Sequence, residues 1–315
     1  MKKKLIIAII AVVLVAAVVT PLATLAGRGY FAYKSISEVV TAPALSADGS
    51  FVIMSANIRR MEKATSTSKM DVGDHRWYKR AEYYLANIAF VHPDILGAQE
   101  VLPEQYDFLV KHLEGYASVV TYRDDKGSRS ESCPIFYNKN RFEYISDGTY
   151  WLSKTPNEMS RSWGATEYRI TTYVKLKDKV TGETIAFFNA HPEWKVDQGR
   201  TQELQVIADV IQQVEADKTV LLGDLNTYKE ELEGAGIAAL APIEAILADS
   251  KDLANTYYGY TFNNYGIINP EDPQAGLDYI YLPKDATVRE VGKVDTIYDG
   301  VYASDHFPIY AKVIL

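Results

Sequence analysis

Residues 219–226 read Thr-Val-Leu-Leu-Gly-Asp-Leu-Asn, an apolar run that ends in the polar residues Asp224 and Asn226. A short apolar run that ends at a glycine is typical of a buried β-strand. Polar side chains directly after such a strand are carried by a rigid element, which suits residues that must hold a fixed position. The stretch therefore predicts a buried strand whose end supplies side chains to a cleft.

Strand-like runs of this kind recur from residue 51 to the end of the chain. The clearest is Phe51–Ile58, and Ile95–Ala98 follows it. Strand-like segments with a more mixed pattern cover residues 116–122, 135–137, 170–176, 184–189, 277–282 and 309–315.

Two amphipathic helices interrupt these strands. Apolar residues at helical spacing begin at Trp77, with Asp74 as the expected cap, and again at Leu204. The first helix is expected to bury Trp77 and to leave Arg76 and Arg80 in solvent. Strands interrupted by two or three helices, with no break in composition after residue 50, predict one α+β domain in which two β-sheets pack face to face and helices lie outside.

The composition narrows the possible chemistry. The 315 residues include 33 basic and 41 acidic side chains, so the net charge is −8. An acidic surface gives no general attraction to nucleic acid, and any nucleic-acid substrate would need a local basic patch and a bound cation. The single cysteine, Cys133, excludes an internal disulfide and a thiolate zinc cluster.

The amino terminus carries a targeting pattern. Three lysines, Lys2 to Lys4, precede an apolar run whose 22 residues from Leu5 to Ala26 suffice to cross the ~30 Å hydrocarbon core of a bilayer. The pattern predicts a signal-anchor transmembrane helix over residues 1–27, a linker over 28–50 and a catalytic domain over 51–315. The lysines favour a single-pass protein of the cell membrane with its domain outside the cytoplasm. The alternative is a cleaved signal peptide and a secreted enzyme.

A set of polar residues follows the predicted strands. Any one of them alone is an ordinary turn former or helix cap. Together they supply carboxylates and amides, the hard ligands that suit Mg²⁺ or Mn²⁺, and two histidines for proton transfer. Hydrolysis of a phosphate ester needs this inventory. The set comprises Asn57, Glu100, Asn189, His191, Asp224, Asn226, Asp278, Asp305 and His306.

The order of these motifs carries a family resemblance. The chain resembles the endonuclease/exonuclease/phosphatase superfamily, and in particular its deoxyribonuclease-like metal-dependent phosphoesterases, over residues 51–315. The resemblance implies a four-layered α/β sandwich, here preceded by an N-terminal transmembrane helix in a bacterial membrane-anchored member. The matching motifs are Asn57-Ile58-Arg59, Gln99-Glu100-Val101, Asn189-Ala190-His191, Gly223-Asp224-Leu225-Asn226, Leu277-Asp278-Tyr279-Ile280 and Ser304-Asp305-His306.

The resemblance also implies a role for each residue. Glu100 would be the principal ligand of Mg²⁺ or Mn²⁺, with Ca²⁺ as an alternative ion, and Asn57 and Asp305 would complete the metal site. Asp278 would orient His306, which acts as general base or phosphate contact. Asp224 and Asn226 would position the attacking water and the phosphate, and His191 would lie on the leaving-group side. Arg169 and Asn189 would contact the substrate.

Three functions remain open from the sequence. The first is nuclease-like hydrolysis of phosphodiesters outside the cytoplasm, favoured because His191 and His306 together supply an acid and a base. A sphingomyelinase-like phospholipid phosphodiesterase and a phosphomonoesterase acting on inositol, sugar or nucleotide phosphates are the alternatives. A noncatalytic anchored adaptor is disfavoured because no expected ligand is missing. The predicted partners are the phosphate-ester substrate and, through the N-terminal helix, the membrane. No protein partner is evident, and a monomer is expected.

Overall fold

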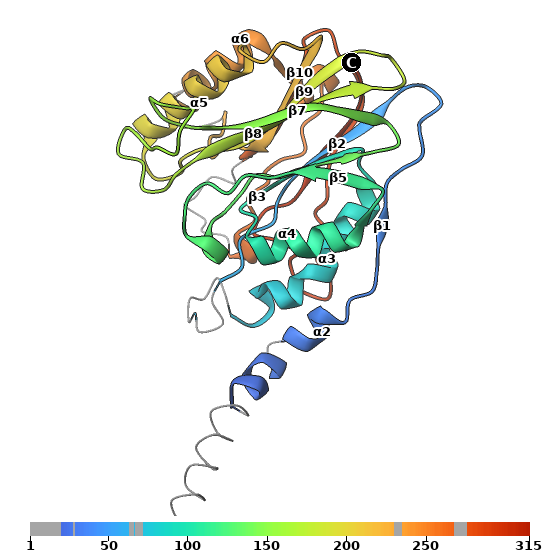
Figure 1. The fold of residues 1–315 in the computed structure, drawn as a ribbon, viewed down its shortest axis with the longest axis vertical. Helices are drawn as coiled ribbons and strands as arrows, with labels where there is room; N and C mark the ends of the chain where they lie inside the picture. Colours follow the sequence, from blue (N-terminus) through green and yellow to red (C-terminus); the bar gives the residue numbers. More distant parts are fainter. Residues whose placement is uncertain (1–19, 28, 63–65, 67–71, 230–234, 268–275) are drawn as a thin grey trace, which may run out of the picture.

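The structure, a computed structural model, describes residues 20–27, 29–62, 66, 72–229, 235–267 and 276–315. Two six-stranded sheets dominate it (Figure 1). The first is built around the parallel neighbours β2 (Phe51–Asn57) and β3 (Ile95–Gln99), which α3 (Trp77–Val91) connects. Because these two strands run in the same direction, Asn57 and Gln99 are direct neighbours at their carboxyl ends.

The second sheet repeats this arrangement. Its parallel neighbours are β9 (Thr184–His191) and β10 (Lys218–Asp224), connected by α5 (Asp197–Ile211). The antiparallel strand β12 (Asp278–Leu282) lies on the other side of β10, and the register sets Asp278 opposite Asp224. The carboxyl ends of both parallel pairs therefore carry the polar residues that the sequence analysis singled out.

The remaining elements complete the two sheets. The first sheet has the order β13-β14-β2-β3-β6-β5 and the second β11-β12-β10-β9-β8-β7. The added strands are β5 (Tyr116–Val119), β6 (Ile135–Asn138), β7 (Phe142–Trp151), β8 (Ile170–Asp178), β11 (Ala248–Asp249), β13 (Thr287–Lys293) and β14 (Ile309–Ile314). The further helices are α4 (Pro103–His112), α6 (Ala235–Ile246) and α7 (Ser250–Ala254), with 3₁₀ turns η2 (Gly73–His75), η3 (Gly127–Arg129) and η5 (Asn264–Gly266).

Three apolar clusters hold four layers together. The cluster between the sheets includes Ile53, Phe187 and Leu222, all fully buried. A second cluster packs α3 and α4 against the first sheet, and a third packs α5 and α6 against the second. Figure 1 shows these helices on the two outer sides of the paired sheets. The predicted α/β sandwich of two packed sheets flanked by helices is confirmed.

The start of α3 differs from the prediction in two ways. Asp74 does not cap the helix, because it lies in η2 and Arg76 occupies the cap position. Trp77 is buried as expected, but Arg76 and Arg80, both predicted in solvent, are buried with it. The Arg80 guanidinium donates to the backbone oxygens of Ile58 at 2.9 Å and Ala303 at 2.6 Å. A cation expected in solvent therefore joins the loops that follow β2 and precede β14.

Residues 1–19 of the predicted transmembrane segment lie outside the described residues, and residues 20–27 lie within them. Within the part of the chain that the structure describes, no helix is both long and apolar enough to cross a membrane.

Two short elements within residues 29–50, part of the segment predicted as a linker, pack against the domain. Helix α2 (Tyr30–Lys34) buries Tyr33, whose ring stacks on Phe108 at 5.1 Å between centroids. Strand β1 (Val40–Thr41) pairs in parallel with β4 (Leu113–Glu114). The physical reason is that Tyr33 and Val40 fill apolar space beside α3 and α4 that would otherwise face water.

We expect Tyr33→Ala to lower the free energy of unfolding of the full chain by about 3 kcal/mol, because an aromatic side chain leaves a buried cluster. Phe31→Ala removes a neighbouring ring that is 48% exposed and should change stability by less than about 0.5 kcal/mol. Urea unfolding followed by fluorescence measures both. Equal unfolding midpoints for the two variants would show that this segment does not belong to the core.

Candidate active site

The ends of the two parallel pairs open into one cavity of about 490 Å³. Strand β10 reaches it because Gly223 lies so close to β9 that a Cβ atom there would come within 2.1 Å of the Ala190 oxygen. Of the residues singled out from the sequence, those that line the cavity are Glu100, Arg169, His191, Asp224, Asn226, Asp305 and His306. The cavity therefore collects side chains from most of the predicted motifs.

Asp278 and His306 form a buried hydrogen-bonded pair. His306 Nδ1 lies 2.9 Å from Asp278 Oδ2, and His306 Nε2 lies 3.5 Å from Asp224 Oδ2. Burial alone would lower the pKa of His306, but the two carboxylates raise it to about 10. His306 is thus held as an imidazolium, which favours a phosphate contact over a general base.

Asp224 lies between the two histidines. Its Oδ2 is 3.6 Å from His191 Nε2 and accepts a hydrogen bond from Asn57 Nδ2 at 2.9 Å. Burial raises the pKa of Asp224 above its ordinary value, although the positive charge of His306 acts to lower it. A carboxylate with a raised pKa at a cavity wall is suited to accept a proton.

His191 has a different protonation state from His306. The Arg169 Nη1 atom lies 3.3 Å from both ring nitrogens of His191. Burial, assisted by the charge of Arg169, lowers the pKa of His191 well below its ordinary value. The site therefore combines one neutral and one protonated histidine.

Glu100 is fixed at the end of β3. Its Oε2 accepts from the Arg60 backbone at 3.1 Å, and its Oε1 lies 3.4 Å from Asn57 Nδ2. Burial would raise the pKa of Glu100, but the positive charge of Arg59 and the hydrogen bond from the Arg60 backbone hold the pKa below its ordinary value. Glu100 is therefore an ionised, buried carboxylate.

The residues predicted to bind the metal fit a cation. The Arg59 guanidinium lies 3.7 Å from Glu100 and 3.6 Å from Asp305, so these two carboxylates already share one positive charge. Asn57 adjoins Glu100 and adds an amide. A divalent ion held by this oxygen-rich set would offset phosphate charge and polarise the phosphorus centre.

A second group of residues also has the spacing of a metal site. One ligand atom each from Asp224, Asp278 and His306 lie within 4.8 Å of one another. An imidazolium has no lone pair to offer, so an ion there would require His306 to lose its proton. A protonated His306 therefore makes this group less suited to a cation than the carboxylates of Glu100 and Asp305.

Asn189 does not contact the substrate cavity, which corrects the prediction. Its amide donates to the backbone oxygens of Ala98 and Pro134, and its oxygen accepts from Gln99 Nε2 at 2.7 Å. All of these partners belong to the other sheet or its loops. Asn189 thus joins the two sheets beneath the site.

Asn226 is held at the cavity by two hydrogen bonds. Its backbone donates to Asp224 Oδ1 at 3.0 Å, and its amide donates to the Pro192 oxygen at 2.9 Å. Its backbone is left-handed, with a φ of 50°, a conformation that asparagine tolerates. The predicted place of Asn226 beside the phosphate position is consistent with this geometry.

Sequence reasoning missed a network of arginines on the cavity wall. Glu131 accepts from Arg60 at 2.9 Å and from Arg123 at 2.8 Å, and Glu167 lies 3.4 Å from Arg123. Among the described residues, Arg169 is the wall arginine with no carboxylate within ion-pair distance. The near-neutral charge balance of residues 123–131 concealed this network, because Arg60 and Glu167 join it from distant segments.

An exposed aromatic residue at the cavity was also missed. Trp194 is 55% exposed and lines the cavity together with Lys195, whose Nζ lies 4.9 Å from the centre of its ring. The Glu193 carboxylate accepts from the backbone of both residues at 2.8 and 2.9 Å. The unusual Pro192-Glu193-Trp194 sequence after His191 was the available signal.

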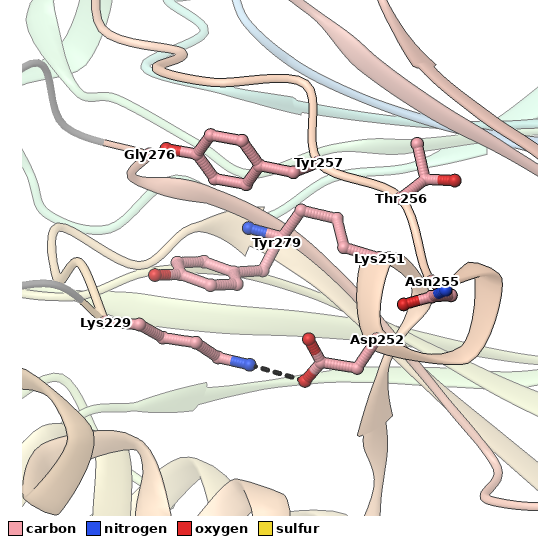
Figure 2. A pocket seen from close by; sticks show the side chains of 8 residues that line it. All are labelled: Lys229, Lys251, Asp252, Asn255, Thr256, Tyr257, Gly276 and Tyr279. Atoms are coloured by element: carbon pink, nitrogen blue, oxygen red, sulfur yellow. Dashed lines mark hydrogen bonds and ion pairs between the residues drawn. The ribbon is translucent and has the colours of Figure 1, made fainter.

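A second cavity, of about 280 Å³, lies beside β12 (Figure 2). Figure 2 shows Lys251 between the rings of Tyr257 and Tyr279, and Lys229 beside Asp252. Lys229 Nζ contacts Asp252 at 2.8 Å, and Lys251 Nζ lies 4.8 Å from the centre of the Tyr279 ring. The two lysines of this second cavity are thus already engaged. The predicted catalytic residues that line a cavity, His191, Asp224, Asn226 and His306, line the larger one instead.

Comparison with known proteins agrees with this geometry. An endonuclease/exonuclease/phosphatase from Bacteroides vulgatus has a TM-score of 0.74 and 26% identity, covering 84% of this chain and 99% of that one. The mannosyl-6-phosphatase of Bacteroides thetaiotaomicron has a TM-score of 0.70 and 25% identity, covering 84% of this chain and all of that one.

A shorter similarity links the chain to a curated protein. The CCR4-Not complex 3'-5'-exoribonuclease subunit Ccr4 of Mycosarcoma maydis is 28% identical over 136 residues, which are 38% of this chain and 20% of that protein. The chain thus spans about a fifth of the length of this relative. The family model of the Endonuclease/Exonuclease/phosphatase family matches residues 54–306, from β2 to His306. This chain belongs to that family, whose members are divalent-metal-dependent hydrolases of phosphate esters.

Proposed function

We propose that this chain hydrolyses phosphodiesters, in the manner of a nuclease-type phosphoesterase, with Mg²⁺ or Mn²⁺ held by Glu100, Asp305 and Asn57. The observation that carries the proposal is the position of Asp224 between a neutral and a protonated histidine, at 3.6 and 3.5 Å. Asp224 accepts a proton from the attacking water. The bond between phosphorus and the leaving oxygen breaks, and the released alkoxide takes a proton from solvent water. His306, held protonated by Asp278, donates a hydrogen bond to a phosphate oxygen.

The charge of the cavity wall favours a diester over a monoester. Arg60 and Arg123 are paired with Glu131, and Arg59 with Glu100 and Asp305. Arg169 alone offers a guanidinium not already paired with a described carboxylate, which matches the single negative charge of a diester. The net charge of −8 and these paired cations favour a small diester over a long nucleic acid.

Hydrolysis of a monoester is the second candidate. It is favoured by the similarity to the mannosyl-6-phosphatase over that protein's whole length. A cavity of about 490 Å³ also has the size of a small-molecule site. A sugar, inositol or nucleotide phosphate is the corresponding substrate.

A substrate panel distinguishes the two candidates. The purified enzyme with Mg²⁺ or Mn²⁺ is assayed on an aryl phosphodiester, plasmid DNA, RNA, sphingomyelin, and inositol and sugar monophosphates at matched concentrations. We expect the highest kcat/KM on a diester. A higher kcat/KM on any monoester, abolished by His306→Ala to exclude a contaminant, would make the phosphatase the leading function.

We further propose that residues 1–27 anchor the enzyme with its domain outside the cytoplasmic membrane. Lys2 to Lys4 and the uncharged run that follows support this orientation. Protease added to wall-stripped cells should then digest the domain. Protection of the domain in these wall-stripped cells would contradict the orientation, and a soluble extracellular form beginning near Gly27 would indicate a cleaved signal instead.

A further inference from the structure

Two glutamates lie buried behind the wall of the cavity. Neither Glu193, in the loop after β9, nor Glu203, on α5, is exposed to solvent. Glu203 Oε2 accepts a hydrogen bond from the backbone of Glu193 at 2.7 Å. Two neighbouring carboxylates out of water repel each other when both are ionised, so one of them is expected to keep its proton.

The hydrogen bonds of the two carboxyl groups indicate which one is charged. Glu193 accepts from the backbones of Trp194 at 2.8 Å, Lys195 at 2.9 Å and Thr166 at 2.9 Å. Glu203 accepts from the Glu193 backbone, but its Oε1 has no hydrogen-bond partner among the described residues. Because donors directed at a carboxylate favour its ionised form, Glu193 is the charged member of the pair and Glu203 the neutral one.

The pKa shifts agree with this assignment. Burial would raise the pKa of Glu193, but hydrogen bonds from the backbones of Lys195 and Thr166 hold the pKa below its ordinary value. Burial raises the pKa of Glu203 to about 8, although the hydrogen bond from Glu193 and the charge of Arg169 act to lower it. Glu193 and Arg169 are the charged groups that act on Glu203, and at neutral pH Glu203 keeps its proton.

Glu193 fixes two loops of the cavity wall. Its carboxylate joins Thr166, which precedes β8, to Trp194 and Lys195, which follow β9. Those three residues line the cavity. Glu203 holds the backbone of Glu193 from behind, so α5 sets the position of this part of the wall.

Arg169 gives the charge of Glu203 a second consequence. Its Nε is buried and has no hydrogen-bond partner among the residues that the structure describes. The charge of Arg169 already acts on Glu203, so an ionised Glu203 would attract the guanidinium. A neutral Glu203 instead leaves the charge of Arg169 available to a phosphate group in the cavity.

We propose that Glu203 is a positioning residue that acts as a neutral acid. It holds Glu193, and through Glu193 the loop that carries Trp194 and Lys195, and it adds no negative charge that would compete with the substrate for Arg169. Loss of the Glu203 proton therefore weakens substrate binding at alkaline pH. The inference rests on the proposed function only in taking Arg169 as a contact of the substrate phosphate.

Hydrogen–deuterium exchange of the full chain at pH 7, followed over residues 164–168 and 192–196, tests the wall without any substrate. Glu193→Gln should speed exchange there about tenfold, because an amide has one accepting oxygen for three backbone donors. Glu203→Gln should stay within about twofold of the wild type, because an amide offers the same one acceptor and one donor side as a neutral acid. Asp209→Asn removes an exposed charge of α5 and should leave the exchange unchanged.

Kinetics on an aryl phosphodiester with Mg²⁺ supply the second readout. From pH 7 to pH 9 the KM of the wild type should rise about tenfold, because only about a tenth of the molecules keep the Glu203 proton at pH 9. The KM of Glu203→Gln should stay within about twofold over this range, since nothing at this position titrates. His306, with a pKa of about 10, titrates in both proteins and does not distinguish them.

Two results would overturn the proposal. One is a KM of Glu203→Gln that is already about tenfold above that of the wild type at pH 7, which would mean that the charge of Glu203 is needed. The other is a KM of Glu203→Gln that rises with pH as steeply as that of the wild type. If the wild type does not hydrolyse the diester, the proposed function fails instead, and the exchange rates of Glu193→Gln and Glu203→Gln still decide the roles of the two glutamates.

Discussion

Replacing Glu100 with glutamine is expected to leave the fold intact and to lower kcat/KM by more than about 100-fold. Loss of a residue that only supports a metal ligand costs up to about 100-fold, and loss of a charge on the ligand itself should cost more. The substitution keeps the side-chain volume but removes one of the charges that hold the cation. It also disrupts the hydrogen bonds of this side chain. The two carboxylate oxygens accept from the Arg60 backbone and from Asn57, whereas an amide has only one oxygen that accepts. Steady-state kinetics over a range of Mg²⁺ concentrations measure the loss.

A matched control separates this effect from a general change in charge. Glu104 lies four residues further on, at the exposed start of α4, and its carboxylate contacts Lys34 at 3.3 Å. Glu104→Gln should retain the kcat/KM of the wild type, since exposed pairs contribute little. Undiminished turnover of Glu100→Gln at ordinary Mg²⁺ would remove Glu100 from the metal site.

The sequence predicts best those strands that are buried on both faces. Phe51–Asn57 and Lys218–Asp224 were located within a residue or two, because nearly every side chain in them is buried and the apolar run is continuous. β7 was missed, since only Phe142 of its ten residues is buried. β13 was missed for the same reason, because it lies at a sheet edge and none of its residues is fully buried. Where few side chains of a strand are fully buried, no continuous apolar run is required.

Site residues that follow a strand could be predicted from the sequence. Contacts between segments that are far apart in the sequence could not. Asp224, Asp278 and His306 lie together in the structure because their motifs stand at strand ends or next to them. Arg80 looked like a solvated cation on a helix, since its acceptors Ile58 and Ala303 are far away in sequence. Asn189 was predicted to contact the substrate because its motif matches the family. In the structure, hydrogen bonds to the other sheet use both polar atoms of its side chain.

Asp278 and His306 are expected to act as one unit, and their losses should therefore not multiply. The Asp278 carboxylate lies 2.9 Å from His306 Nδ1 and keeps the imidazole charged and oriented. His306→Ala should lower kcat by about 100- to 1000-fold, the range for one removed transition-state donor. Asp278→Asn should lower it by about 10- to 100-fold, since the ring stays but loses its charge and its fixed direction.

The double variant decides whether the two residues are coupled. Once His306 is gone, Asp278 has no ring to orient, so the double variant should be about as active as His306→Ala alone. Tyr281→Phe, which removes a hydroxyl further along β12, serves as a control and should combine with His306→Ala by simple multiplication. If the double variant instead shows the product of the two single losses, then Asp278 acts separately from His306. Its contribution would then have to come through Asp224, which lies opposite Asp278 in the neighbouring strand.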